Sequence, residues 1–375
     1  MHDLADLDTP AALIDVPCMQ ANIARMQSRM DALGVQLRPH VKTSKCLDVV
    51  KRQLAAGARG ITVSTLKEAE EFFAAGIDDI LYAVCIAPAK LPRALALRRQ
   101  GCDLKLVTDS VAGAEAIARF GHAQGEVFEA WIEIDVDGHR SGIPPEGEAL
   151  LAVGRALHAG GVRLGGVMAH AGGSYGCDTP EALQAAAEQE RAGTVRAAGR
   201  LRRAGLPCPV VSVGSTPTAL SAQSLDGVTE VRAGVYVFFD LVMHNIGVCT
   251  MDEIALSVLT EVIGHQPDKG WAIVDAGWMA MSRDRGTQAQ ARDFGLGQVC
   301  TEDGTPIEGY IVDSANQEHG IVARVGSPDR AIDERLPVGT RLRILPNHAC
   351  ATAAQFPGYH AVDGVAATWP RFGGW

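Results

Sequence analysis

The sequence predicts an α/β protein in which a closed TIM-type (β/α)8 barrel is followed by an antiparallel β domain. From about residue 22 to residue 241, short apolar or β-branched runs alternate with longer segments of helical period, a pattern typical of parallel βα units. About eight such runs occur, which is the strand number of a closed barrel. Beyond residue 241, Asp, Gly and Pro turns separate short strands with few helical segments, as in an antiparallel sheet.

The predicted barrel strands occur in the order that eight βα units require. They are VQLRPHVK (35–42), GITVST (60–65), DILYAV (79–84), DLKLVT (103–108), FEAWIEID (128–135), RLGGVMAH (163–170), PVVSVGST (209–216) and EVRAGVYV (230–237). The clearest helical segments between them are Leu66–Ala75, Ala89–Gln100 and Pro180–Arg203. A doubly wound open sheet is the alternative, but such sheets normally carry a glycine-rich turn after the first strand, and this sequence has none there.

The β domain is predicted from strands at 254–266, 271–277, 320–325 and 340–346. We therefore place the barrel at residues 12–242 and the β domain at residues 243–375. No Pro/Ser-rich or low-complexity linker separates them, so we expect the two domains to pack together.

Composition excludes several classes of protein. With 375 residues, 47% apolar and 21% charged, the chain is neither disordered nor a coiled coil. No uncharged apolar stretch is long enough for a membrane helix and the N-terminus carries acids, so we expect a cytoplasmic protein without a membrane partner. The net charge of −10 argues against a nucleic-acid partner. Nine scattered cysteines indicate free thiols, one of which could be a metal ligand.

Polar residues stand where the predicted barrel strands end, which is where barrels carry their active sites. Lys42 ends the first strand beside His40 and Thr43, a setting that could lower its pKa as a Schiff-base lysine requires, although an isolated lysine there is more often merely solvated. The GSTPT segment after the seventh strand suits either an ordinary helix cap or a phosphate site. A reactive amine with a phosphate site points to pyridoxal 5′-phosphate.

A second candidate site lies in the segment RILPNHACATAAQ of the β domain. His348 and Cys350 stand two residues apart after an apolar strand, so in an extended segment their side chains point to one face. Imidazole and thiolate suit zinc or a similar divalent ion. A buried cysteine beside a hydrogen-bonded histidine is an equally good interpretation of this spacing.

Seven motifs together resemble the fold type III pyridoxal-phosphate enzymes of the D-threonine aldolase and D-serine dehydratase family. They are RPHVKTSK, GHRSG, AHAGGSY, VGSTPT, AGVYVFFD, NQEHG and PNHAC, and they span nearly the whole chain in the expected order. The resemblance implies an alanine-racemase-like barrel followed by a β domain that residues 1–11 join. It also implies a homodimer.

The resemblance assigns roles to individual residues. It makes Lys42 the Schiff-base lysine, Arg140 the partner of the cofactor's phenolic oxygen, and His170 and Tyr175 ring-facing or substrate-side residues. It makes Ser215, Thr216, Gly234 and Tyr236 phosphate contacts, and His348 and Cys350 ligands of a divalent metal (Zn, Mn, Mg or Co). One departure is Ser44, which stands where the family often has histidine.

The reaction implied is dehydration of a D-3-hydroxy amino acid, such as threo-3-hydroxy-D-aspartate, D-serine or D-threonine, to a 2-oxo acid and ammonia. Dehydratases of the family carry His-x-Cys at PNHAC, whereas its aldolases carry His-x-Asp. The alternatives are retro-aldol cleavage to glycine and an aldehyde, racemisation, or a non-catalytic carrier of pyridoxal phosphate. Carriers lack a second domain such as residues 243–375. Arg283 is a candidate for binding a β-carboxylate on chemistry alone.

Overall fold

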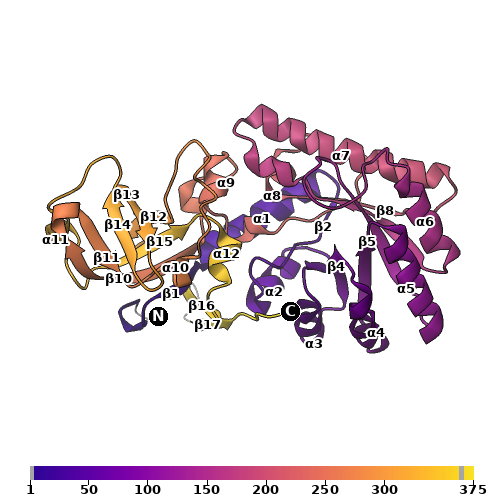
Figure 1. The fold of residues 1–375 in the computed structure, drawn as a ribbon, viewed down its shortest axis with the longest axis horizontal. Coiled ribbons are helices and arrows are strands. Elements are labelled where there is room, and N and C mark those ends of the chain that lie inside the picture. The colour runs from indigo at the N-terminus through magenta and orange to yellow at the C-terminus, as the bar shows by residue number, and fades with distance from the viewer. Residues whose placement is uncertain (1–3, 363–366) are drawn as a thin grey trace. The chain divides into compact units, whose positions relative to one another are not determined.

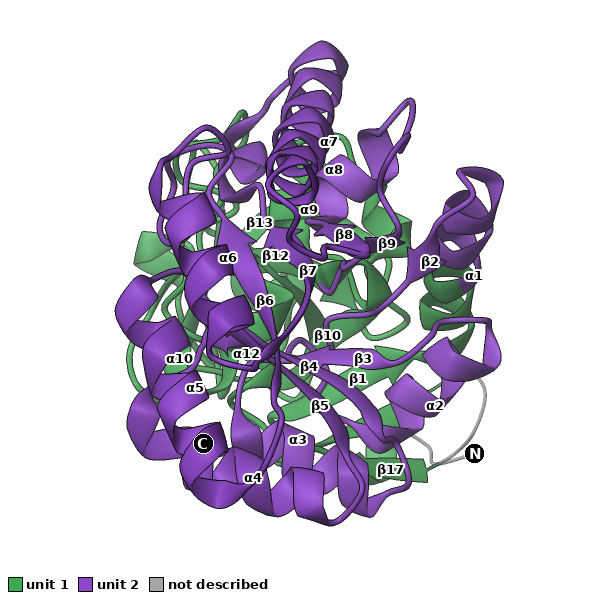
Figure 2. Ribbon diagram, turned by 90° about the vertical axis from the view of Figure 1, so that its right-hand side faces the viewer, with its two compact units in different colours: residues 1–23, 235–373 green, residues 24–234, 374–375 purple. Residues whose placement is uncertain are grey.

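The structure is a computed structural model that describes residues 4–362 and 367–375. The chain folds into two compact units (Figure 2). Residues 24–234 with 374–375 form one, here called the barrel unit, and residues 1–23 with 235–373 form the other, here called the β unit. The division near residue 234 lies before the boundary at 242 that the sequence predicts.

The barrel unit contains a parallel sheet of eight strands in the order β2-β9-β8-β7-β6-β5-β4-β3. Their bounds are β2 Gln36–Leu37, β3 Ile61–Val63, β4 Asp79–Cys85, β5 Asp103–Thr108, β6 Glu129–Ile134, β7 Arg163–Ala169, β8 Val210–Val213 and β9 Glu230–Val231. A parallel bridge between His40 and Thr62 joins the chain after β2 to β3 and so connects the two edges of the sheet. The predicted (β/α)8 fold is confirmed. Strands β2 and β9 are shorter than predicted, because a turn at residues 41–44 follows β2 and the 3-10 turn Val235–Val237 follows β9.

Helices alternate with these strands and lie outside the ring, as Figure 2 shows for α3 to α7. Their bounds are α2 Leu47–Ala55, α3 Leu66–Ala74, α4 Leu91–Arg99, α5 Val111–Gln124, α6 Ala149–Ala159, α7 Pro180–Arg203 and α8 Thr216–Ser221, with 3-10 turns η2 Pro88–Lys90 and η3 Gly172–Gly176. Thr65, Ser110 and Thr179 cap α3, α5 and α7 by accepting a hydrogen bond from a first-turn N–H. Helix α1 (Val16–Ala32) runs across the division between the units.

The β unit has a nine-stranded sheet (Figure 1). Its strands are β1 Ala11–Asp15, β10 Leu256–Gln266, β11 Trp271–Val274, β12 Gly297–Thr301, β13 Pro306–Ala315, β14 Gly320–Arg324, β15 Arg341–Pro346, β16 Gly358–Val362 and β17 Ala367–Pro370. Six of them close a ring, β10-β11-β14-β13-β12-β15, and β1, β16 and β17 extend it from β10. All ladders are antiparallel except that between β1 and β16.

The core of the β unit follows from alternation along its strands. On β15, Leu342 and Ile344 join the hydrophobic cluster with Val258 and Val299. Side chains alternate across a strand, so Arg343 and Leu345 lie on its other face. Short helices and turns complete the unit: η1 Leu4–Asp6, η4 Val235–Val237, α9 Leu241–Asn245, η5 Met251–Glu253, η6 Pro267–Lys269, α10 Trp278–Met281, α11 Ile332–Arg335 and α12 Ala349–Ala353. Among the described residues, no helix has the length and apolar character to cross a membrane.

Candidate active site

Two lysines follow β2, and their surroundings differ. Lys45 forms an ion pair with the buried carboxylate of Glu68, with Nζ 3.1 Å from Oε1. The amine of Lys42 has no such partner within residues 4–362 and 367–375. Lys42 is therefore the lysine of this pair whose amine is available to a ligand. Ser44, the departure from the family pattern, is buried, and its hydroxyl lies 3.5 Å from the carbonyl oxygen of Val41.

Two histidines at the strand ends are held in their neutral form. Burial, reinforced by the positive charges of Arg140 and Lys42, lowers the pKa of His170 to about 3. Its Nδ1 lies 2.8 Å from the carbonyl oxygen of Gly214, so Nδ1 donates and Nε2 remains an acceptor. Burial together with Lys42 also lowers the pKa of His40 well below its ordinary value. The positive charges of Lys42 and Arg140 therefore act on both histidines.

Glu190 on α7 connects the turns after β7 and β8. Its Oε1 accepts hydrogen bonds from the N–H groups of Ala171 and Gly214, both at 2.9 Å. Its Oε2 accepts from the hydroxyl of Thr218 at 2.6 Å. The carboxylate is fully buried, and burial raises its pKa. Glu190 therefore ties the AHAGGSY turn to the GSTPT turn, a role that the sequence did not reveal because α7 looks like an ordinary covering helix.

The GSTPT segment is a helix cap in the structure. Ser215 caps α8 through Thr218 N–H, and its hydroxyl also lies 2.9 Å from that of Ser174. Both Ser215 and Thr216 are buried. The nearby Gly234 admits no side chain, because a Cβ there would lie 2.8 Å from the carbonyl oxygen of His40. The structure therefore shows the ordinary helix cap that was one of the two interpretations of this motif. The backbone of the GSTPT segment remains the candidate phosphate contact.

The turn that carries Arg140 is held by carboxylates. Ser141 donates its hydroxyl to Glu133 at 3.0 Å, and the N–H of Gly142 donates to Asp109 at 3.2 Å. The thiol of Cys85 donates to Glu133 at 3.3 Å, and burial with the neighbouring carboxylates raises its pKa. Arg140 itself is exposed. These partners come from the ends of β4, β5 and β6, and only the fold brings them together.

In the β unit the structure brings His348 and Cys350 together, but not in an extended segment. His348 stands at the N-cap of α12 and Cys350 lies in the first turn of that helix, so the expected strand alternation is wrong. Partial burial opposes a charge on His348, but hydrogen bonds with Asp284 and Cys350 raise its pKa to about 11. Asp284 approaches Nδ1 to 2.6 Å, so Nε2 is the ring atom that remains for Cys350 or for a metal ion. This is the arrangement of a metal-binding histidine with an orienting carboxylate.

A buried aspartate fixes the start of α12. Asp240 caps α9 through Met243 N–H and accepts from the N–H of Ala349 at 2.9 Å. Burial raises the pKa of Asp240 to about 6, against the lowering effect of the His348 charge. The roles of Asp240 and Asp284 were both missed from the sequence, because their contacts with Ala349 and His348 join positions more than 60 residues apart.

The remaining predicted residues have the following positions. The ring of Tyr175 lies 6.2 Å from that of His170, measured between centroids. Tyr236 is fully buried in η4 of the β unit. Arg283 is exposed, with its guanidinium carbon 4.5 Å from the ring centroid of Trp278.

The barrel-strand ends fit pyridoxal phosphate on one observation. The buried Nδ1 of His40 has no hydrogen-bond partner among the residues described, which marks a place where a polar ligand atom is missing. Close packing of the chain explains Gly214, with φ of 146°, because a Cβ there would lie 1.9 Å from the carbonyl oxygen of Arg232. The donor set of His348 and Cys350 fits a divalent ion of the zinc type.

Comparison with known proteins gives a consistent result. The family model "Alanine racemase, N-terminal domain" matches residues 14–242, and "Putative serine dehydratase domain" matches residues 255–362. A D-threo-3-hydroxyaspartate dehydratase from Delftia sp. (strain HT23) is 69% identical over 376 residues, covering 99% of each chain. A D-threonine aldolase from Arthrobacter sp is 31% identical over 373 residues, covering 96% of this chain and 91% of its own.

A solved structure of a D-threo-3-hydroxyaspartate dehydratase is also similar throughout. It is a cysteine-to-alanine mutant in its metal-free form, 69% identical, with a TM-score of 0.99 and full coverage of both chains. The similarity to a dehydratase thus exceeds that to an aldolase by more than twofold in identity.

Proposed function

Because the chain belongs to the pyridoxal-phosphate-dependent family that joins an alanine racemase N-terminal domain to a serine dehydratase domain, we propose that it dehydrates D-3-hydroxy amino acids such as threo-3-hydroxy-D-aspartate. The products would be a 2-oxo acid and ammonia. The observation that carries this proposal is the pair His348 and Cys350, with His348 oriented by Asp284.

Lys42 is the residue we propose to hold pyridoxal phosphate. Its amine has no competing partner among the described residues, unlike that of Lys45. Bound pyridoxal phosphate supplies an electron sink for the charge left at the substrate Cα. The Lys42 amine would act as the general base that takes the Cα proton of the substrate.

Other residues would position the cofactor. Arg140 supplies a positive charge for the phenolic oxygen, from a turn that Glu133 and Asp109 hold in place. Neutral His170 presents Nε2 as an acceptor. The proposed phosphate and ring contacts are Ser215, Thr216, Gly234, Tyr236 and Tyr175.

His348 and Cys350 are proposed to hold a divalent ion, which the metal-free description of a relative supports. Such an ion supplies Lewis-acid polarisation of the substrate's β-hydroxyl, which makes hydroxide a better leaving group. Asp284 keeps the His348 proton on Nδ1 and so leaves Nε2 as a ligand atom. Loss of the Cα proton and the β-hydroxyl yields an enamine, and its hydrolysis releases the 2-oxo acid and ammonia.

The test is a substrate panel with metal added. Holoenzyme is given the D and L forms of threo-3-hydroxyaspartate, serine and threonine, and ammonia release is followed with time. The proposal expects the D forms to react, with threo-3-hydroxy-D-aspartate fastest. Release of ammonia from the L forms alone would refute it.

A further inference from the structure

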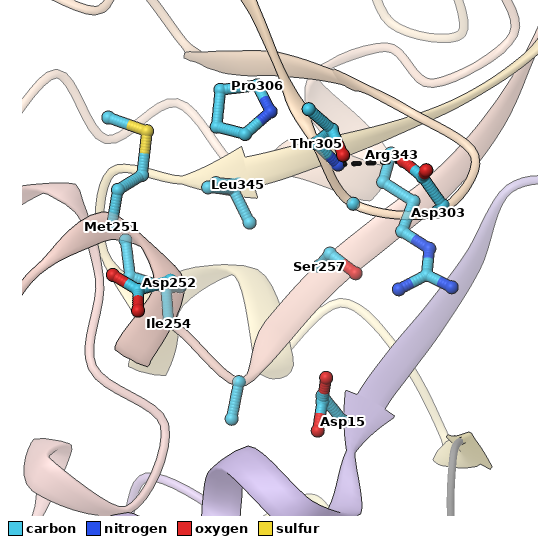
Figure 3. A pocket seen from close by; sticks show the side chains of 12 residues that line it. Asp15, Met251, Asp252, Ile254, Ser257, Asp303, Thr305, Pro306, Arg343 and Leu345 are labelled. Atoms are coloured by element: carbon cyan, nitrogen blue, oxygen red, sulfur yellow. Dashed lines mark hydrogen bonds between the residues drawn. The ribbon is translucent and has the colours of Figure 1, made fainter.

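The β unit contains a cavity separate from His348 and Cys350 (Figure 3). Its volume is about 470 Å³, and it lies among the end of β1, η5, the start of β10, the turn from β12 to β13, and β15. Arg343 reaches it from the face of β15 that points away from the hydrophobic core. None of the residues proposed for catalysis lines this cavity.

Arg343 is the unusual group of the cavity. Only 7% of it is exposed, and its Nε has no hydrogen-bond partner among the described residues. No carboxylate forms an ion pair with Arg343 in the part of the chain that the structure describes, although the charges of Arg343 and Asp303 act on each other. A guanidinium cannot shed its proton, so burying it unpaired is costly. Figure 3 shows the guanidinium directed into the space beside Ser257 and Asp15. An anionic group of a ligand would give this guanidinium a direct partner.

A simple anion does not suit the rest of the cavity, because three carboxylates line it. Asp303 is engaged within its own turn, where its Oδ1 accepts from the N–H of Thr305 at 3.0 Å. Asp15 uses only Oδ1, which accepts from Cys18 N–H at 2.8 Å, and Asp252 is exposed. Burial and the charges of Asp15, Glu253 and Asp252 raise the pKa of Cys18 to about 12, which reflects the negative potential here.

We propose that this cavity binds a free α-amino acid. The carboxylate would pair with Arg343, and the ammonium group would face Asp15 and Asp252. The apolar side chains of Ile254 and Leu345 line the same cavity and suit a short aliphatic side chain. The volume is within the range of small-molecule pockets, which combine apolar walls with a few placed polar groups.

The test measures binding of glycine to the holoenzyme by isothermal titration calorimetry, with acetate and methylamine as single-charge probes. The visible absorbance of the enzyme is recorded in parallel, because it reports ligands at the cofactor rather than in this cavity. We expect Arg343→Gln to weaken calorimetric glycine binding at least tenfold and to leave the spectral response unchanged. Arg324→Gln, at an exposed position at the end of β14 and outside the cavity, is the matched control and should bind glycine like the wild type.

Asp15→Asn gives a second variant that preserves the acceptor for Cys18 N–H and removes only the charge. It should weaken glycine binding but not acetate binding. Equal glycine binding by the wild type and Arg343→Gln would overturn the proposal, as would acetate binding as tight as that of glycine. The comparison of glycine binding between the wild type and Arg343→Gln does not depend on which reaction the enzyme catalyses. Failure of the cavity proposal and failure of the dehydratase proposal can therefore be distinguished.

Discussion

The Nδ1 atom of His348 lies 2.6 Å from Oδ2 of Asp284, a carboxylate 64 positions earlier in the chain. Because a carboxylate accepts and does not donate, this contact places the imidazole proton on Nδ1 and leaves Nε2 to bind a metal ion. The same contact limits rotation of the ring, so it sets both the tautomer and the direction of the ligand atom.

Asp284→Asn should lower metal affinity by about 10- to 100-fold, the usual effect of losing an orienting carboxylate. The amide can present its N–H₂ group to Nδ1 and so favour the wrong tautomer. Metal affinity is measured by equilibrium dialysis against a competing chelator. Asp313→Asn, an exposed site on β13, is the control and should bind metal like the wild type. Unchanged affinity in Asp284→Asn would remove Asp284 from this role.

Replacing either proposed metal ligand should abolish stoichiometric metal binding. We expect His348→Ala and Cys350→Ala to lower activity on the order of 100-fold, because the polarisation of the hydroxyl is lost. Chelation of the wild type should have the same effect and metal add-back should reverse it. Full activity after exhaustive chelation would show that His348 and Cys350 have a structural role and do not hold a catalytic metal.

Lys42→Ala should remove the visible absorbance of the bound cofactor, whereas Lys45→Ala should keep it. The reason is that Lys45 is engaged by Glu68. Loss of that partner leaves a buried carboxylate with one hydrogen bond fewer and should cost about 1–3 kcal/mol of stability. Spectra and denaturant titrations separate the two effects. An unaltered spectrum in Lys42→Ala would show that this lysine does not hold the cofactor.

Glu190→Ala should weaken cofactor binding more than tenfold, and Glu190→Gln should weaken it much less. Alanine leaves the buried N–H groups of Ala171 and Gly214 without an acceptor, at about 1–3 kcal/mol each. Glutamine retains an acceptor for both and can donate to Thr218. Cofactor affinity is measured by dialysis and stability by urea unfolding. Equal cofactor affinity in both variants would exclude the proposed connection between the turns.

The stability of the cofactor-free enzyme should fall as the pH falls below 6.5, because of His170. Its pKa of about 3 in the folded chain lies below the ordinary value, so only the unfolded chain gains a proton between these pH values. Between pH 6.5 and 5 the free energy of unfolding of the wild type should fall by up to about 2 kcal/mol more than that of His170→Asn. The raised pKa of Asp240 acts in both proteins and cancels in this difference. If the free energy of unfolding of the two proteins changed equally with pH, that result would contradict a buried, neutral His170 imidazole.

The barrel could be predicted from the sequence because its signal is local. Each buried strand is an apolar run, and each run is followed by a helical period, so all eight were identified. Strand β1 was missed, since its pairing with β10 involves residues more than 240 positions apart. The His348–Cys350 pair was found by residue type, but the extended geometry assumed for it was wrong because α12 begins there.

The supporting residues of the site could not be predicted from the sequence. Asp284, Glu190 and Glu133 are ordinary acids until the fold places them against His348, the strand-end turns and the Arg140 turn. Their roles depend on distances between segments that no local pattern encodes. Motifs therefore suggested candidate groups for a cofactor or metal, and the structure shows which other side chains hold those candidates in place.

The most direct test of the account is the product ratio from threo-3-hydroxy-D-aspartate with holoenzyme and metal. Dehydration predicts a 2-oxo acid and ammonia in equal amounts, with little glycine. Retro-aldol cleavage of the same substrate would instead give glycine and an aldehyde without ammonia. Glycine as the main product would contradict the dehydratase assignment.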